Sequence, residues 1–116
     1  MMSRGYEEAL KNAELIKKSG GRVGAGTDSF GTSLSFTGQY WWELSHLKQA
    51  GFSNFEVLES ATRINADIIG LGDKIGTIKA GKLADLAVID GDPLSDLEAV
   101  SRVRRTVKGG KTVYVN

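Results

Sequence analysis

The N-terminal part of the chain carries the hydrophobic pattern of an amphipathic helix. Between residues 4 and 18, apolar side chains recur at steps of three and four positions, and charged side chains fill the opposite face. Gly20 and Gly21 follow the basic residues Lys17 and Lys18, which is a typical helix end. We therefore predict a helix over residues 4–18.

A short apolar stretch at residues 22–26 predicts a strand directly after this helix. It ends on Gly26-Thr27-Asp28, and residues 29–39, rich in Gly, Ser and Thr, are expected to form a loop. A helix joined to a strand by so short a turn is typical of an αβ unit in a parallel sheet. Because ligands bind at the carboxyl ends of such strands, Asp28 is the first candidate for a functional side chain.

Two further helices are expected in the middle of the chain. Trp41, Leu44 and Leu47 lie on one stripe of the first, which should run from about residue 40 to residue 50. The second begins with the capping-box sequence Ser53-Asn54-Phe55-Glu56, in which the two end residues each satisfy a free backbone amide of the other. This helix should continue to about residue 69.

From about residue 73 the pattern changes to short strands separated by Gly, Asp and Pro. They are expected at Ile75, Ile78 and residues 83–89, 103–107 and 112–115. Lys108-Gly109-Gly110-Lys111 is a hairpin signal between the last two strands, and Ser95-Asp96-Leu97-Glu98 predicts a short helix that starts at Ser95. We therefore expect an α/β chain with two parts, residues 1–72 and residues 73–116.

Composition narrows the class of protein. The chain has 116 residues, of which 41% are hydrophobic and 25% charged, as in an ordinary globular protein. A net charge of +1 produces no overall electrostatic field that would attract nucleic acid or an anionic membrane. No apolar run reaches the 18 residues of a membrane span. The absence of cysteine excludes disulfides and thiolate metal sites. We expect a cytoplasmic protein without nucleic-acid or membrane partners.

Two motif-like features do not support a site. The glycines of Gly24-Ala25-Gly26 lack the third glycine of a dinucleotide-binding loop, because Ser29 stands at that position, and the phosphate-loop lysine is missing. Glu43 and His46 have the spacing of half a di-iron site, which also needs a second Glu-x-x-His motif. His46 is the only histidine, so we interpret it as a helix-surface or interface residue.

Two clusters of side chains have competing interpretations. The basic residues near the C-terminus should alternate between strand faces without interleaved aromatics, which favours a charged hairpin edge over a nucleic-acid patch. They are Arg102, Arg104, Arg105, Lys108 and Lys111. Five aromatic residues could line a pocket for an apolar substrate group or could equally form a packed cover. They are Phe30, Phe36, Tyr40, Trp41 and Trp42.

Several segments carry a family resemblance in their order along the chain. The most specific is the run from Ile75 to Asp90, IGTIKAGKLADLAVID. The others are Gly26-Thr27-Asp28, Thr62-x-x-Asn65-Ala66 with Ile69-Gly70-Leu71, Asp92-Pro93-Leu94 and Val107 to Lys111. From Val23 onward the sequence resembles the C-terminal end of metal-dependent amidohydrolases, particularly the imidazolonepropionase-like and prolidase-like branches.

The resemblance implies both a fold and a chemistry. Residues 1–72 would be the terminal βα part of a (β/α)8 barrel, and residues 73–116 would be short strands of a small composite β-sandwich. The family hydrolyses amide and related C–N bonds of small molecules, including dipeptide-like substrates, with one or two divalent metals, often zinc. By this resemblance Asp28 is a metal ligand and the catalytic proton acceptor.

The departures from the family pattern are equally informative. The H-x-H pair, the carboxylated lysine or its equivalent, and two further histidines are absent, and His46 lies after Asp28 rather than before it. We therefore expect a C-terminal segment that holds no metal and is inactive alone. The alternative is a non-catalytic module that completes another chain or assembles with itself, and a homo-oligomer or complementing chain is expected in that case.

Overall fold

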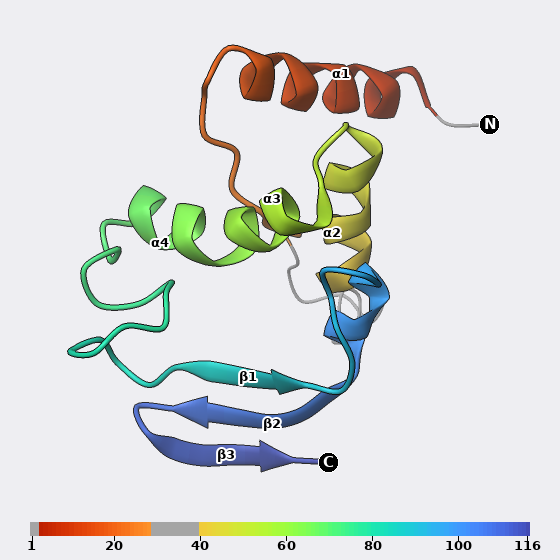
Figure 1. Cartoon of the computed structure of the whole chain (residues 1–116). Coiled ribbons are helices and arrows are strands. Elements are labelled where there is room, and N and C mark those ends of the chain that lie inside the picture. The colour runs from red at the N-terminus through yellow and green to blue at the C-terminus, as the bar shows by residue number, and fades with distance from the viewer. Residues whose placement is uncertain (1–2, 29–39) are drawn as a thin grey trace.

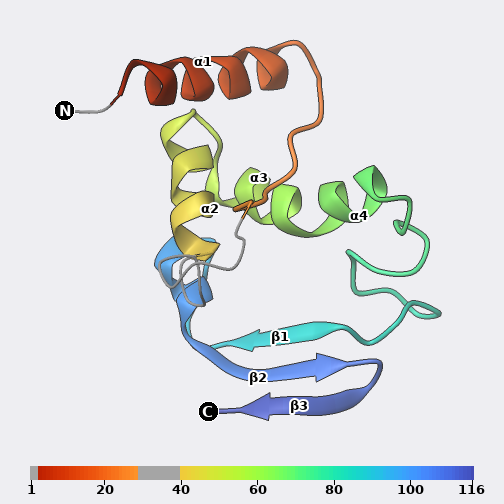
Figure 2. The ribbon, with the colours of Figure 1, turned by 180° about the vertical axis from the view of Figure 1, so that it is seen from behind.

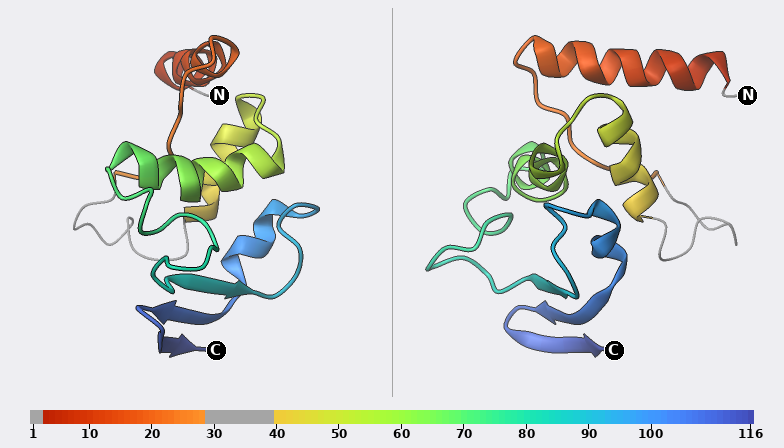
Figure 3. Two further views of the ribbon diagram at one scale, coloured as in Figure 1. Left: turned by 60° about the vertical axis from the view of Figure 1, so that its left-hand side comes forward. Right: turned by 45° about the vertical axis from the view of Figure 1, so that its right-hand side comes forward.

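The computed structural model describes residues 3–28 and 40–116, and these form three layers (Figure 1). The first layer is one helix, the second is a helical layer in the middle, and the third is a small sheet that ends at the C-terminus. The layers remain distinct from behind (Figure 2) and in two intermediate views (Figure 3). The helices are α1 (Arg4–Lys18), α2 (Tyr40–Gln49), α3 (Asn54–Glu59), a π-helical turn (Ser60–Ile64) and α4 (Asn65–Ile68).

The helix boundaries follow the capping signals of the sequence. Ser3 caps α1, and Gly20 follows it with a φ of 78°, a conformation that suits glycine. The capping box of α3 is present, with the Ser53 hydroxyl accepting from the Glu56 amide and the Glu56 carboxylate accepting from the Ser53 amide. The helices predicted at residues 4–18 and 40–50 are confirmed, and the helix predicted at residues 53–69 is present but interrupted by the π-helical turn Ser60–Ile64.

The hydrophobic core lies in the helical layer. Its buried members are Ala25, Leu44, Leu47, Ala50, Phe52, Val57 and Leu97. The last of these lies in a 3-10 helix, Leu97–Ser101, which packs against α2. Helix α1 has no buried residue, and its apolar contact with this core comes from the partly buried Leu10 and Ala13. Helix α1 is therefore the most weakly anchored of the described helices.

The sheet contains three antiparallel strands in the order β1 (Leu86–Ile89), β2 (Val103–Lys108) and β3 (Lys111–Val115). Lys108 pairs with Lys111 across the tight turn, so the predicted hairpin is confirmed. The predicted strands at Ile75 and Ile78 are wrong, because residues 72–83 form successive turns. The Lys82 ammonium organises these turns by donating to the Gly72 carbonyl and, at 2.6 Å, to the Thr77 hydroxyl.

The strand predicted at residues 22–26 is also wrong. This segment connects α1 to the helical layer without regular secondary structure. A parallel strand needs a neighbouring strand to complete its ladder, and all the strands in the described residues belong to the β1–β3 sheet. The sequence pattern was that of a strand, but the partners that would make it one are not among these residues.

The start of the 3-10 helix differs from prediction by one residue. Asp96 rather than Ser95 is the cap, and its carboxylate accepts a hydrogen bond of 3.2 Å from the Glu98 amide. The Ser95 hydroxyl instead donates to Asp92 at 2.8 Å. A carboxylate was available next to the serine, and both are good capping groups.

Candidate functional site

Asp28 lies exposed at the end of the segment that enters the helical layer. Its φ is 51°, in the left-handed region that non-glycine residues seldom adopt and that aspartate tolerates better than most. The carboxylate expected at the end of a strand therefore follows an irregular connecting segment.

The backbone before Asp28 is bonded to helices instead of strands. The Ala25 amide donates to the Ser60 carbonyl at 3.4 Å, and the Ala25 carbonyl accepts from Asn65 Nδ2 at 2.7 Å. The Gly26 amide donates to Glu43 Oε1 at 3.4 Å. Each backbone polar group needs a partner when it is buried, and these helices supply the partners for the only buried residue of the segment, Ala25.

Glycine is required at Gly24 by a close approach. A Cβ atom at this position would lie 2.2 Å from Asn65 Oδ1 and 3.0 Å from the end of Ile68. The Gly24 backbone therefore passes directly against α4. This contact and the hydrogen bonds of Ala25 fix the segment on one side.

Helix α2 carries several polar side chains, of which Glu43 accepts a hydrogen bond from this segment. Burial raises the pKa of Tyr40, and the negative charge of Glu43 raises it further. Tyr40 therefore stays a neutral hydroxyl. The His46 ring packs edge-on against Tyr6 of α1 with centroids 5.2 Å apart, which agrees with its interpretation as an interface residue.

The described residues do not form a metal centre on their own. Asp28 supplies one carboxylate, and residues 3–28 and 40–116 contain no group of three His, Cys, Asp or Glu side chains that could hold a metal ion. A catalytic divalent metal usually takes three protein ligands. These residues therefore do not fit a complete metal site, and no reaction step through a metal is derived from them.

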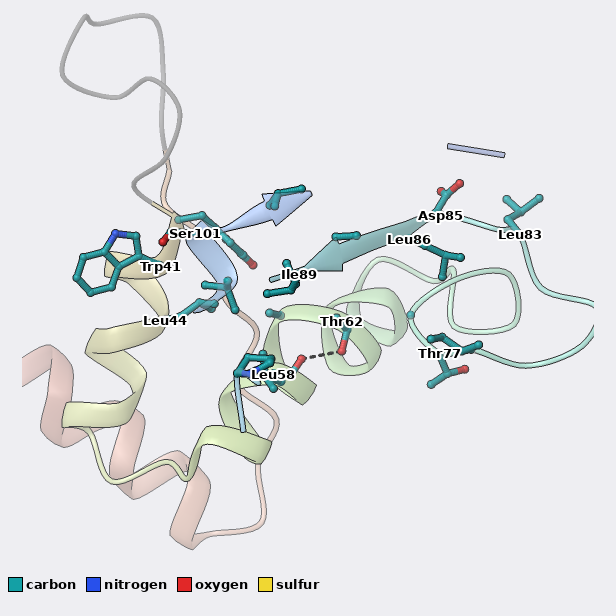
Figure 4. A pocket seen from close by; sticks show the side chains of 18 residues that line it. Trp41, Leu44, Leu58, Thr62, Thr77, Leu83, Asp85, Leu86, Ile89 and Ser101 are labelled. Carbon is teal, nitrogen blue, oxygen red and sulfur yellow. Dashed lines mark hydrogen bonds between the residues drawn. The ribbon is translucent and has the colours of Figure 1, made fainter. Parts of the chain in front are cut away.

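A separate apolar cavity of about 560 Å³ lies between the helical layer and the sheet (Figure 4). The helices contribute Tyr40, Trp41, Leu44, Leu58, Ala61 and Thr62 to its wall. The sheet and the turns before it contribute Thr77, Leu83, Asp85, Leu86, Ile89 and Val103, among others. Its volume and apolar lining are typical of small-molecule pockets.

The cavity and Asp28 are different places on the molecule, because Asp28 does not line the cavity. Of the five aromatic residues in the sequence cluster, Tyr40 and Trp41 line the cavity. Trp42 packs against Trp41, with 5.6 Å between the ring centroids. Phe30 and Phe36 lie outside the described residues. The structure therefore supports a pocket wall for two of the five residues.

Three of the five basic residues near the C-terminus are paired with carboxylates. Arg102 lies 3.2 Å from Asp96, and Arg104 lies 3.5 Å from Asp90. Lys108 lies 2.5 Å from Asp85. Pairing of this kind fits the charged hairpin edge better than a nucleic-acid patch.

In the described part of the chain, no helix is long and apolar enough to cross a membrane.

Sequence reasoning missed two features of this region. Asn65 was recognised only as part of a motif, and its bond to Ala25, 40 residues away, has no signal in a single sequence. The cavity was anticipated only through its aromatic residues. Leu83, Leu86 and Ile89 of the apolar run at residues 83–89 line it together with residues of α2, and this arrangement depends on the tertiary fold.

Comparison with known proteins identifies the class of this fold. A family model described as the amidohydrolase family matches residues 6–113. No curated protein is significantly similar to the chain.

Solved structures that resemble the chain are prolidase-like. A putative prolidase from Bifidobacterium longum is 35% identical with a TM-score of 0.80, and the match covers 90% of this chain and 26% of that one. A Xaa-Pro dipeptidase with methionine bound in its active site is 27% identical with a TM-score of 0.80, and the match covers 92% of this chain and 25% of the dipeptidase. A prolidase complexed with N-methylphosphonate-L-proline is 29% identical with a TM-score of 0.79, and the match covers 92% of this chain and 26% of that prolidase. The chain spans about a quarter of the length of these structures.

Proposed function

Because the chain belongs to the amidohydrolase family, we propose that it is the C-terminal segment of a metal-dependent hydrolase that acts on amide, peptide or cyclic amide bonds. The observation that carries this proposal is the family match over residues 6–113, together with prolidase-like structural neighbours. Two of those neighbours hold an amino acid or a proline analogue. The substrate class we propose is therefore a small dipeptide-like amide.

The two parts of the chain receive different roles in this proposal. Residues 1–72 would be the terminal βα part of the (β/α)8 barrel, and residues 73–116 would belong to a small composite β-sandwich. Helices α1 to α4 lie wholly within residues 1–72 and strands β1 to β3 lie wholly within residues 73–116, which supports this division (Figure 1). Residues 22–26 would become a barrel strand only beside neighbouring strands, which supply the missing ladder.

Asp28 is the residue we propose as metal ligand and catalytic proton acceptor. It is exposed, it follows the small residues Gly26 and Thr27, and helices hold the backbone before it. The sequence has one histidine and no cysteine, so the other metal ligands would come from polypeptide beyond these 116 residues. The chain alone is accordingly expected to hold no stoichiometric zinc and to be inactive, and we place the protein in the cytoplasm.

A segment exchange tests the proposal. The matched quarter of the Bifidobacterium longum putative prolidase is replaced by this chain, and hydrolysis of Xaa-Pro dipeptides is measured together with metal content and thermal unfolding. We expect a folded, metal-loaded and active hybrid that Asp28→Asn inactivates, and Asp73→Asn, another exposed aspartate, should leave the activity unchanged. A hybrid that folds and holds metal but hydrolyses nothing would contradict the proposal, as would full activity of Asp28→Asn.

A second candidate function is a non-catalytic interaction or self-assembly module. The observation that favours it is that β1 and β3 each have one edge without a neighbouring strand in the described sheet, and that Val113 and Val115 of β3 are exposed. Exposed apolar edge strands pair readily with other chains. Sedimentation and calorimetry of the 116-residue chain test this candidate. A compact monomer with a sharp melting transition would argue against it.

A further inference from the structure

The side chain of Asn65 connects the helical layer to the segment that ends at Asp28. Asn65 is the first residue of α4, and its Nδ2 donates a 2.7 Å hydrogen bond to the Ala25 carbonyl. The bond is partly buried and joins residues 40 positions apart. Hydrogen bonds shielded from water are the ones that fix a backbone position well.

The other backbone group of Ala25 is held from the same place. The Ala25 amide donates to the carbonyl of Ser60, a fully buried residue. Ser60 begins the π-helical turn that ends immediately before Asn65. The carbonyl at the start of this widened turn and the side-chain amide of the residue that follows it therefore bind the same residue, and such turns occur frequently at functional sites.

The two glycines on either side of Ala25 are restrained as well. Gly24 lies so close to Asn65 that a Cβ atom there would be 2.2 Å from Oδ1. The Gly26 amide is bonded to Glu43, which restricts the residue with the greatest backbone freedom before Asp28. The segment is thus held from both sides just before Asp28.

We propose that Asn65 is the positioning residue for the Asp28 carboxylate. Asn65 holds the backbone at Ala25, three residues before the carboxylate. This inference rests on the proposed function of Asp28. The backbone of Asp28 is in the left-handed region, and residues other than glycine keep such a conformation where surrounding contacts hold them in it. Loss of the Asn65 hydrogen bond would release that restraint without removing any group that touches substrate.

Asn54 provides a matched control in the same chain. Its Nδ2 also donates to a backbone carbonyl 40 residues away, that of Leu94 at 2.8 Å, which lies outside the Asp28 segment. Asn65→Asp and Asn54→Asp each remove an amide donor at constant size. A merely structural role would make the two variants equivalent.

The first measurement uses the 116-residue chain and needs no activity. Backbone NMR chemical shifts and hydrogen exchange of residues 24–28 should change in Asn65→Asp and stay unchanged in Asn54→Asp, while signals of the Leu44 and Val57 core persist in both. Equal disturbance of residues 24–28 by both variants, or by neither, would overturn the proposal. If either aspartate variant fails to fold, Asn65→Ser and Asn54→Ser replace the pair.

The second measurement uses the prolidase hybrid. Asn65→Asp should lower kcat roughly 10- to 100-fold with little change in KM, as expected for a misplaced catalytic group, and Asn54→Asp should leave both constants near those of the parent hybrid. Unchanged kcat in Asn65→Asp would overturn the inference. An inactive parent hybrid would count against the proposed function instead, and the NMR comparison would still decide whether Asn65 fixes the segment.

Discussion

The Nζ atom of Lys17 lies 2.7 Å from Oε2 of Glu56 and joins the end of α1 to the start of α3. The same ammonium donates to the Gly51 carbonyl at 2.7 Å and lies 5.0 Å from the centre of the Phe52 ring. Because α1 has no buried residue, this polar junction carries much of its attachment. The Tyr6 hydroxyl adds a 3.0 Å hydrogen bond to Gln49 at the other end of the helix.

Removing the Lys17 ammonium should loosen α1. Lys17→Met keeps the length of the side chain and loses the ion pair and the carbonyl bond, so we expect about 1 kcal/mol lower stability and faster hydrogen exchange in α1. Lys18→Met is the control, because Lys18 pairs within its own helix, with Glu14 one helical turn away. Urea unfolding and exchange mass spectrometry measure the effect. Equal losses in the two variants would contradict the junction.

The effect of Lys17→Met should depend on pH. The hydrogen bond from Lys17 lowers the pKa of Glu56, and the Ser53 amide lowers it further. A carboxylate whose pKa is lowered by folding adds stability above its unfolded pKa, and this stability is lost as pH falls through the folded pKa. The difference in Tm between wild type and Lys17→Met should therefore be largest near neutral pH and shrink in acid. A difference that grows in acid would be inconsistent with the pair.

The close approach at Gly24 predicts a position-specific glycine effect. In Gly24→Ala the new methyl group would meet Asn65 Oδ1, so α4 must shift or the segment must leave its place. We expect lower stability and disturbed signals in residues 24–28. Gly5→Ala is the control, since nothing lies within 4 Å of a Cβ there and alanine in a helix is favoured by up to about 1 kcal/mol. Opposite signs of the two Tm changes are the expected result.

The sequence predicted elements whose signals are local. The capping box at Ser53, the glycine after α1 and the hairpin turn at Lys108 depend on neighbouring residues, and each was found as predicted. The predictions that failed depend on distant partners. Residues 22–26 have a strand pattern but no ladder, and residues 75–78 are organised by Lys82 instead of by a neighbouring strand.

The candidate site shows the same division. Asp28 could be selected from the small residues before it and from the family resemblance, and the structure adds its exposure and left-handed backbone. The hydrogen bond between Asn65 and Ala25 could not be predicted, because amide side chains bond to many kinds of partner. The role of Asp28 itself stays a prediction until the hybrid enzyme is measured.

The hydroxyl of Ser60 is a buried polar group without a partner among the described residues. The residue is fully buried and its Oγ makes no hydrogen bond within the described part of the chain, although the Ser60 carbonyl accepts from the Ala25 amide. Burying an unsatisfied hydroxyl costs about 1–3 kcal/mol in proteins. Ser60→Ala removes that group, keeps the carbonyl and leaves only a small void.

We therefore expect Ser60→Ala to be neutral or to stabilise the chain by up to about 1 kcal/mol. Thr62→Val is the control, because the Thr62 hydroxyl donates a 2.6 Å hydrogen bond to the Leu58 carbonyl and its loss should be neutral or destabilising. Urea unfolding of both variants gives the comparison. A loss of 2 kcal/mol or more in Ser60→Ala would instead mean that the hydroxyl has a partner, for example a buried water, and that the polar contacts of this turn extend beyond Asn65 and Ala25.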